Sequence, residues 1–233
     1  MREELLGKLW LVLIAAIVST AAVISAALIV IGGPLARRLA DGGKASEKPS
    51  EFVAHFDGSL DSADGEQAYE RGVSFVRGHT RQAVLIDDED TLSYLTDSHI
   101  DPQQGAIEFW LQPLWNGDDE QTYVFFEVGD TWFNRLRITK DGANNLRFMV
   151  WSSQVEYGVA CNVAYWIAKD WHEVRATWQE DALSLYLDDS LCDSQTFVTM
   201  PDHLSSRFYI GSSAQRDTQA QAAIDEFAIY PKP

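Results

Sequence analysis

The chain has 233 residues, of which 46% are hydrophobic and 12% aromatic; this suits one ordinary domain with its own core plus an additional segment. From Glu51 onward, 12 Lys and Arg residues stand against 31 Asp and Glu residues, a formal balance of −19. This charge excludes nucleic acids and anionic membrane surfaces as favoured partners, whereas it favours solubility and cation binding.

The first segment contains a long apolar stretch. Leu9 to Ile31 comprises 23 residues without a formal charge, and at about 1.5 Å per residue a helix of this length crosses the roughly 30 Å hydrocarbon core of a bilayer. A cleaved signal peptide has a shorter apolar region, of about 7 to 15 residues. We therefore predict a retained transmembrane helix in residues 1–33 and a flexible linker, rich in Gly, Ser and Pro, in residues 34–51.

The charges that flank the apolar stretch leave the membrane orientation open. Counted alone, they place the following domain in the cytoplasm, because positive residues tend to stay inside. A large domain can, however, be translocated largely regardless of its charge. The positive residues are Arg2 and Lys8 before the stretch, and Arg37, Arg38, Lys44 and Lys48 after it.

Beyond Glu51 the sequence predicts β-strands. Long helical periodicity is absent, and short alternating apolar runs recur between turn signals, as is typical of an all-β sandwich or barrel. Half-polar alternation of this kind predicts antiparallel sheets with one packed face and one wet face. The apolar positions that share a face are Ile107, Phe109 and Leu111; Leu136 and Ile138; Leu146, Phe148 and Val150; Val174, Ala176 and Trp178; and Leu183, Leu185 and Leu187.

The last predicted strand, Ala222 to Tyr230, carries a charge at an unexpected position. Strict alternation places Asp225 on the same side as Phe227 and Ile229, which are expected to point into the core. A carboxylate buried there requires an ion pair, hydrogen bonds or a metal ion. Hydrogen bonds from backbone N–H groups near a strand end are therefore one explanation of Asp225, and a metal ion is another.

The chain contains two cysteines, Cys161 and Cys192. They form a disulfide if the domain lies in an oxidising compartment, but so sparse a pair is equally compatible with two free buried thiols.

Six short phrases occur in a characteristic order, and together they resemble the laminin G-like, concanavalin A-like jelly-roll domains. The resemblance covers about His55 to Tyr230, nearly the whole part that follows the linker. The phrases are Phe56-Asp57-Gly58, Gly105 to Trp110, Trp171 to Trp178, Leu183 to Asp188, Tyr209-Ile210-Gly211-Ser212 and Ile224-Asp225-Glu226-Phe227.

The resemblance implies a sandwich of two curved antiparallel sheets, with the first and last strands adjacent, that binds glycans or proteins at cell surfaces. It also implies a structural calcium ion near the paired terminal strands. The matching positions here are Asp57 and Asp225, whose carboxylates suit a hard cation that takes six to eight oxygens. Asp57 is otherwise explained as part of an Asp-Gly turn.

Three aromatic residues are candidates for ligand binding. Trp110, Trp151 and Tyr186 fall on the polar side of three predicted strands, where a flat ring flanked by amide and carboxylate groups is available to a sugar. Clustered surface aromatics often mark an interaction surface, although isolated ones need no special explanation.

No catalytic motif is present. Glycosidases of this fold resemble one another in a Glu-x-Asp-x-Glu strand, whose carboxylates flank the scissile bond, whereas Glu108 stands alone between Ile107 and Phe109. The histidines lack the spacing of a catalytic zinc site, and there is no nucleophile elbow or phosphate-binding glycine loop.

The sequence as a whole predicts an all-β, two-sheet antiparallel jelly-roll sandwich of the concanavalin A-like, LamG type in residues 52–233, preceded by one transmembrane helix. We expect a single-pass membrane protein, not an enzyme, whose extracellular or periplasmic domain binds a glycan or a cell-surface protein and holds one calcium ion. The alternative is a structural accessory subunit of a larger membrane or cell-surface assembly, which associates with other membrane subunits and binds no sugar.

Overall fold

The computed structural model describes residues 51–96, 99–129 and 133–233, all of which belong to one compact unit. The predicted transmembrane helix in residues 1–33 and nearly all of the predicted linker lie outside the described residues. In the part of the chain that is described, no helix is long and apolar enough to cross a membrane.

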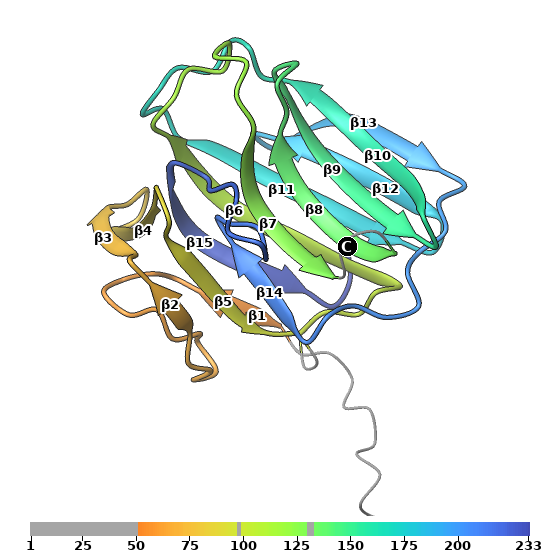
Figure 1. Ribbon diagram of the computed structural model, residues 1–233, viewed down its shortest axis with the longest axis horizontal. Coiled ribbons are helices and arrows are strands. Elements are labelled where there is room, and N and C mark those ends of the chain that lie inside the picture. Colours follow the sequence, from red (N-terminus) through yellow and green to blue (C-terminus); the bar gives the residue numbers. More distant parts are fainter. Residues whose placement is uncertain (1–50, 97–98, 130–132) are drawn as a thin grey trace, which may run out of the picture. The chain divides into compact units, whose positions relative to one another are not determined.

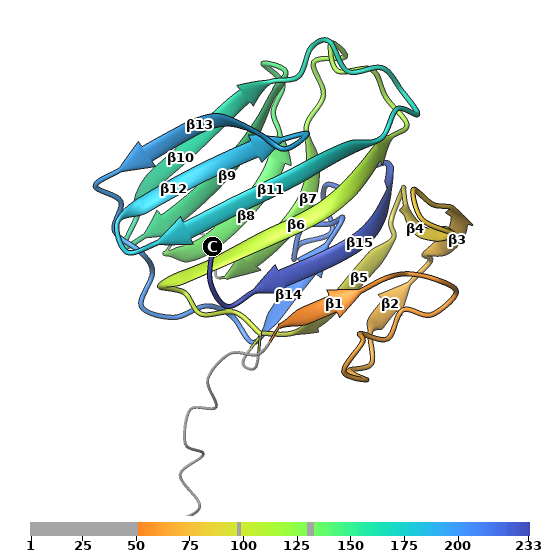
Figure 2. The ribbon, with the colours of Figure 1, turned by 180° about the vertical axis from the view of Figure 1, so that it is seen from behind.

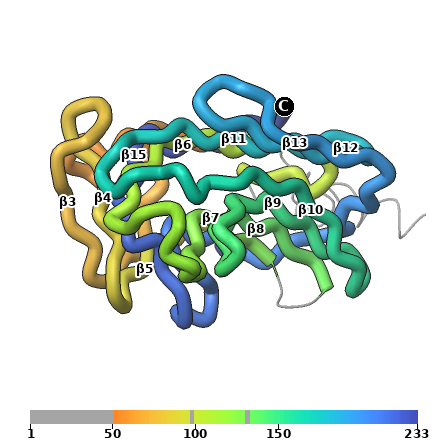
Figure 3. Tube along the Cα trace, turned by 90° about the horizontal axis from the view of Figure 1, so that it is seen from above, coloured from red at the N-terminus to blue at the C-terminus, as the bar shows by residue number. Residues whose placement is uncertain are grey.

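Two antiparallel sheets form the molecule, as the alternating sequence pattern predicts. Figure 1 shows the chain from the side of one sheet, Figure 2 shows it from the side of the other, and Figure 3 shows the two layers edge-on. Sheet A has the order β13-β12-β11-β6-β15-β4-β3, with β1 also paired to β15. Its strands are β1 (Phe52–Ala54), β3 (Ser74–Arg77), β4 (Gln82–Ile86), β6 (Gln104–Pro113), β11 (His172–Gln179), β12 (Ala182–Leu187), β13 (Ser190–Thr196) and β15 (Ala222–Tyr230).

Sheet B has seven strands in the order β10-β9-β8-β7-β14-β5-β2. Its strands are β2 (Tyr69–Arg71), β5 (Thr91–Leu95), β7 (Tyr123–Gly129), β8 (Asn134–Lys140), β9 (Asn145–Ser152), β10 (Val155–Asn162) and β14 (Arg207–Ile210). Strands β8 and β9 form a hairpin across the turn at residues 141–144.

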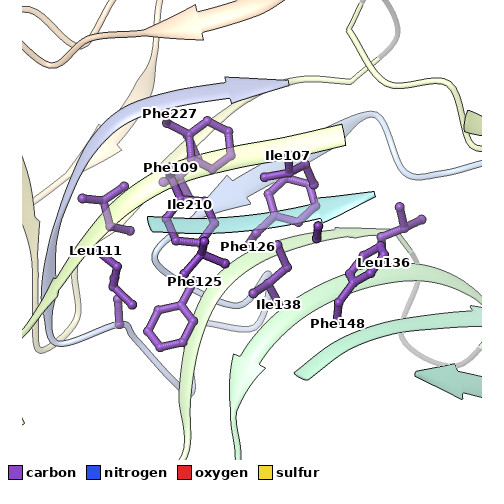
Figure 4. Packing of buried hydrophobic residues seen from close by; sticks show 14 of the residues in the cluster. Ile107, Phe109, Leu111, Phe125, Phe126, Leu136, Ile138, Phe148, Ile210 and Phe227 are labelled. Atoms are coloured by element: carbon purple, nitrogen blue, oxygen red, sulfur yellow. The ribbon is translucent and has the colours of Figure 1, made fainter. Parts of the chain in front are cut away.

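The core lies between the inner faces of the two sheets. The apolar positions that alternate along β6, β8, β9, β11 and β12 are buried there, as predicted. Figure 4 shows Phe109 and Phe227 of sheet A close to Phe126 of sheet B, and the ring centroids of Phe126 and Phe227 are 6.1 Å apart. The side chains at intervening positions therefore point outward and form two outer faces.

Tight turns with positive φ angles set the register of two hairpins. Asp188 and Asp189 join β12 to β13, and Ser153 and Gln154 join β9 to β10. All four residues have φ between 47° and 74°, the conformation of two-residue hairpin turns whose twist matches that of the strands. The second of these turns places Gln154 beside the outer face of sheet B.

The first and last strands are adjacent, as expected, but Asp225 does not point toward the core. Asp225 pairs with Trp110, and the register of β15 against β6 shifts between Asp225 and Ala228. Glu226 lies in this bulge with φ 48°. A bulge adds one residue and breaks strict alternation, so Asp225 shares the outer face with Trp110 while Phe227 and Ile229 face inward. The sequence-based placement of Asp225 is therefore wrong, although the side chain is fully buried.

The two cysteines form a disulfide. Cys161 on β10 and Cys192 on β13 have Cα atoms 6.0 Å apart and are 31 positions apart in the sequence. Strands β10 and β13 are edge strands of different sheets. The bond therefore joins the two layers at one edge of the sandwich, and it resolves the alternative that the sequence left open.

Candidate functional site

An open hollow lies on the outer face of sheet B, beside the start of β8 and the turn that joins β9 to β10. It has a volume of about 520 Å³ and is lined by Phe133, Trp151, Gln154 and Glu156. Phe133 directly precedes β8 and is 53% exposed, and Glu156 pairs with Trp151 across the hairpin. The hollow thus combines an exposed aromatic ring with an amide and a carboxylate, a combination that suits a polar ligand with an apolar face.

Trp151 lies on the outer face of its strand, as the alternation predicts, but its ring is largely covered. Arg135 pairs with Trp151, and its guanidinium carbon lies 3.9 Å from the centroid of the indole ring. Trp151 is consequently only 7% exposed. The ring that is open to solvent in this hollow is therefore Phe133, which the sequence pattern did not single out.

Beside the hollow, one buried carboxylate lies between two arginines. Glu127 is 1% exposed, and its Oε1 accepts a hydrogen bond of 2.9 Å from the backbone N–H of Ala214. Its Oε2 lies 3.7 Å from Nη1 of Arg135 and 3.5 Å from Nη1 of Arg137. Burial lowers the pKa of the Arg135 guanidinium from its usual value, and the charge of Glu127 opposes this shift. Two positive charges thus share one negative charge.

A second cluster of polar side chains surrounds the turn that directly precedes β4, near the paired first and last strands. Oδ2 of Asp225 accepts a hydrogen bond of 2.8 Å from the N–H of Thr80, and its Oδ1 accepts one of 2.9 Å from the N–H of Glu226. Asp57 accepts hydrogen bonds from the N–H of Gln82 at 3.2 Å and from Nη1 of Arg81 at 3.0 Å. Two carboxylates from opposite ends of the domain therefore converge on one turn.

Burial raises the pKa of the Asp225 carboxyl above its usual range. The charges of Glu226 and Asp57 raise this pKa further, whereas the hydrogen bonds from the N–H groups of Thr80 and Glu226 lower it. Glycine at position 78 is required here, because a Cβ atom would come within 2.6 Å of Asp225 Oδ2. The turn consequently packs directly on the carboxylate.

A comparison with protein-family models identifies the fold family. The model of the concanavalin A-like lectin/glucanases superfamily, of the laminin G type, matches residues 87–233. The chain belongs to this superfamily. No curated protein sequence matches this lectin/glucanase-like chain.

Solved structures share the fold of this lectin/glucanase-like domain at low sequence identity. Domain 4 of AbnA, an extracellular arabinanase from Geobacillus stearothermophilus, solved in complex with arabinotriose, is 14% identical with a TM-score of 0.61; the match covers 77% of this chain and 90% of that one. The binding domain of botulinum neurotoxin serotype D is 13% identical with a TM-score of 0.62; the match covers 80% of this chain and 48% of that one. The chain therefore spans about half the length of the toxin binding domains that it matches.

The other two predicted ligand-binding residues lie on the opposite outer face, that of sheet A. The ring of Trp110 stacks on His79, with centroids 3.7 Å apart and an interplanar angle of 7°. Tyr186 lines a separate hollow of about 340 Å³. Trp110 and Tyr186 are thus separated from Trp151 by the whole thickness of this lectin/glucanase-like sandwich, and the three rings do not form one platform.

The hollow beside Tyr186 is acidic. Its other lining residues are Glu108, Glu173, Arg175 and Asp189, and Nε of Arg175 lies 3.7 Å from Glu108. Burial raises the pKa of Glu173, and the charges of Asp189 and Glu108 raise it further. The three carboxylates that line this hollow have one positively charged neighbour, Arg175, so the hollow suits a cationic ligand group better than an anionic one.

Sequence reasoning missed Phe133 and Arg135, which lie beside Trp151, and Arg137 on the same face. A usable signal was present: the three positions alternate with Leu136 and Ile138 along β8 and the residue directly before it, so they share its outer side. Their proximity to Trp151 follows only from the pairing of β8 with β9.

The donors at Asp57 and Asp225 fit a calcium ion in chemical type. Each carboxylate offers about four lone-pair positions. Among the described residues no cationic side chain contacts Asp225, whereas Asp57 is paired with Arg81 at 3.0 Å. Backbone carbonyls of the adjoining turn would have to supply the further oxygens that calcium requires. Among the residues that the structure describes, no group of three or more His, Cys, Asp or Glu side chains is placed to hold a metal ion, so any such site depends on main-chain oxygens.

Proposed function

We propose that this domain is a glycan-binding module whose ligand lies in the hollow on the outer face of sheet B. The observation that carries the proposal is the exposed ring of Phe133 beside Gln154 and Glu156. A sugar presents C–H groups on one face and hydroxyl groups at its edges, so an aromatic ring flanked by hydrogen-bonding groups matches both. Trp151, with Arg135 on its ring, forms the buried wall of this site.

The comparisons support a ligand of this class. The domain of AbnA that shares the fold was solved with arabinotriose bound, and a botulinum neurotoxin DC binding domain that shares the fold was solved in complex with SialylT. The superfamily contains lectins and glucanases. We propose binding without hydrolysis, because no strand of the chain carries the Glu-x-Asp-x-Glu pattern of the glycosidases of this fold.

The cellular setting is also a proposal. A disulfide between Cys161 and Cys192 is expected in an oxidising compartment, which supports an extracellular or periplasmic domain. The apolar stretch Leu9 to Ile31 would then anchor the domain to a membrane. An accessory subunit would share this setting, and ligand binding distinguishes the two roles.

A glycan array tests the site. We expect the full chain, purified in detergent, to bind a defined set of oligosaccharides, and Phe133→Ala to weaken that binding about tenfold, the loss expected for a contact worth about 1.4 kcal/mol. Tyr186→Ala is the matched control, because it removes a ring from the other outer face. We expect it to leave binding unchanged.

Three outcomes contradict the proposal. Absence of binding to every glycan on the array favours the accessory subunit, for which native mass measurement would show a stable stoichiometric complex. Loss of binding in Tyr186→Ala instead of Phe133→Ala would move the site to sheet A. Hydrolysis of a bound glycan that disappears in Glu108→Gln would show that the protein is an enzyme.

We further propose that one structural calcium ion is held by Asp57, Asp225 and carbonyls of the turn before β4. Calcium would neutralise the buried charge of Asp225 and join the first strand to the last. A chelator is expected to lower the thermal midpoint of the full chain by several degrees, since about 1 kcal/mol corresponds to about 2–4 °C in a domain of this size. Asp225→Asn is expected to abolish the response to chelator, whereas Asp193→Asn, on β13 at the other end of sheet A, is expected to retain it. An equal midpoint with and without chelator would refute the site.

A further inference from the structure

The outer face of sheet B carries an unusual share of the positive charge of this acidic domain. Strand pairing places five of the 12 Lys and Arg residues found from Glu51 onward on this one face, and only Glu127 and Glu156 among its acidic strand residues. The five are Arg71 on β2, Arg135 and Arg137 on β8, Arg147 on β9 and Arg207 on β14.

Two of these arginines keep their donor edges free by stacking. The guanidinium carbon of Arg135 lies 3.9 Å from the centroid of the Trp151 ring, and that of Arg207 lies 3.6 Å from the centroid of the Tyr69 ring. A stacked guanidinium uses its flat face for the ring, so its in-plane N–H groups remain available to an acceptor. The stacking also fixes the side chain before a ligand binds.

The donors of this face exceed the acceptors. Arg71 and Arg147 have carboxylate partners at 3.3 and 3.2 Å in Glu89 and Glu156. Arg135 and Arg137, in contrast, share Glu127 at 3.7 and 3.5 Å, which are ion-pair rather than hydrogen-bond distances.

Buried donors without a hydrogen-bond partner outnumber buried acceptors without one on this face. Among the described residues, Nε of Arg135, Nε of Arg137 and Nη1 of Arg207 are such donors, whereas Oε2 of Glu127, at ion-pair distance from two of these arginines, is such an acceptor. Arg135 is only 8% exposed, so its unpaired donor is costly unless a ligand or water meets it. A carboxylate or sulfate group accepts several such N–H donors at once and matches the planar guanidinium.

We propose that the ligand of this face is an anionic glycan, whose carboxylate or sulfate group is bound by Arg137, Arg135 and Arg207. This inference rests on the proposed glycan-binding function and adds the charge of the ligand to it. Phe133 contacts the sugar ring, and the arginines bind the anionic substituent.

The net charge of the domain does not prevent this contact. At about 0.15 M salt the Debye length is about 8 Å, so the remote carboxylates are largely screened, whereas guanidinium groups in direct contact with the ligand are screened much less. An anionic oligosaccharide short enough to contact only this face is therefore compatible with the acidic domain.

Titration with a matched pair of ligands tests the charge. The full chain is titrated with trigalacturonic acid and with its fully methyl-esterified form, which has the same rings without the charges. We expect the acid to bind at least tenfold more tightly than the ester. Arg137→Gln should lower the affinity for the acid about tenfold and leave that for the ester unchanged, whereas Phe133→Ala should weaken both.

Arg175→Gln is the control variant, because Arg175 also lies over a tyrosine ring, that of Tyr186, but on the face of sheet A. We expect it to bind the acid as the unmodified chain does. Arg207→Gln repeats the test on a different strand if Arg137→Gln proves unstable.

The outcomes separate this inference from the function on which it rests. Tight binding of a sulfated heparin tetrasaccharide in place of the uronate supports the inference and identifies sulfate as the anion. Equal affinity for acid and ester, or an array that yields only neutral ligands sensitive to Phe133→Ala, overturns the anionic ligand and leaves the glycan-binding function intact. Binding of no glycan at all overturns both.

Discussion

Replacing Lys140 by Met is expected to lower the free energy of unfolding by about 3 kcal/mol, because removal of one partner of a buried ion pair typically costs about 3–5 kcal/mol. The lower end of that range applies, since the Asp119 side chain retains 22% exposure while that of Lys140 has none.

The structural reason lies in where Lys140 falls along β8. It follows Leu136 and Ile138 at the next core-facing position and pairs with Leu146. Its Nζ donates to Asp119 Oδ1 at 2.7 Å, to Asn144 Oδ1 at 3.0 Å and to the carbonyl oxygen of Gln121 at 3.1 Å. All three protons of the ammonium group therefore have hydrogen-bond acceptors, which come from two loops.

The contacts of Lys140 continue to aromatic residues. Its Nζ lies 5.4 Å from the centroid of the Trp115 ring and 5.7 Å from that of Tyr123, distances at which the ring quadrupole attracts a cation. Methionine has a similar length and fills the same space, so the expected loss reflects the charge and its hydrogen bonds rather than a cavity.

Urea denaturation followed by tryptophan fluorescence measures the change. Lys169→Met is the matched control, because Lys169 is exposed, and a change within about 0.5 kcal/mol is expected for it. Equal midpoints for Lys140→Met and the unmodified chain would show that the buried network contributes nothing.

The pH dependence gives a second measure of the same network. Burial alone would raise the pKa of Asp119, but hydrogen bonds from Lys140 and Tyr123 lower it below the usual value. A carboxyl whose pKa is lower in the folded state contributes stability above its unfolded pKa, and this is lost as pH falls through the folded pKa. The unmodified chain should therefore lose this contribution below about pH 4, near the ordinary aspartate value, whereas Lys140→Met, in which the hydrogen bond from Tyr123 remains, should show a smaller loss.

Reduction of the disulfide is expected to lower the free energy of unfolding by about 3.7 kcal/mol. The estimate follows from the loop-closure entropy of a cross-link between residues 31 positions apart. Because Cys161 and Cys192 lie on edge strands of different sheets, reduction also releases the covalent link between the two layers at this edge. Two hydrogen bonds between these strands remain, from the N–H of Ala160 to Asp193 at 2.9 Å and from the N–H of Gly158 to Gln195 at 2.9 Å.

The measurement compares urea midpoints with and without reductant. A Cys161→Ala/Cys192→Ala double variant controls for other effects of the reductant, and its midpoint should be low in both conditions. A midpoint that does not respond to reductant in the unmodified chain would refute the expected contribution, provided that thiol titration shows complete reduction.

Much of the fold could be predicted from local sequence, because alternation is a local property. The inward residues of β6, β8, β9, β11 and β12 were identified by period alone. The adjacency of the first and last strands came from the family resemblance, and the register of β1 with β15 confirms it.

Alternation failed where the backbone departs from a regular strand. The bulge at Glu226 reverses the side of Asp225, and nothing in the adjacent residue types fixes a positive φ at a glutamate. Asp225 is nevertheless fully buried, and both of its oxygens accept backbone hydrogen bonds. What covers it is a turn from another part of the chain, residues 78–82.

The candidate site was predicted only in part. The polar-side positions of Trp110, Trp151 and Tyr186 followed from period two, but the period does not state which sheet a strand joins. Strand β9 belongs to sheet B, whereas β6 and β12 belong to sheet A, so the three rings lie on two faces.

The sequence by itself determined the class of fold, the inward and outward side of most strand residues and the acidic charge, since these depend on composition and on spacing within one strand. Only the tertiary structure decided which strands are neighbours. It joined Cys161 to Cys192, surrounded Lys140 with oxygen atoms and placed Phe133 and Arg135 beside Trp151. Each of these groupings depends on pairing between segments distant in sequence, and side-chain alternation carries no information about that pairing.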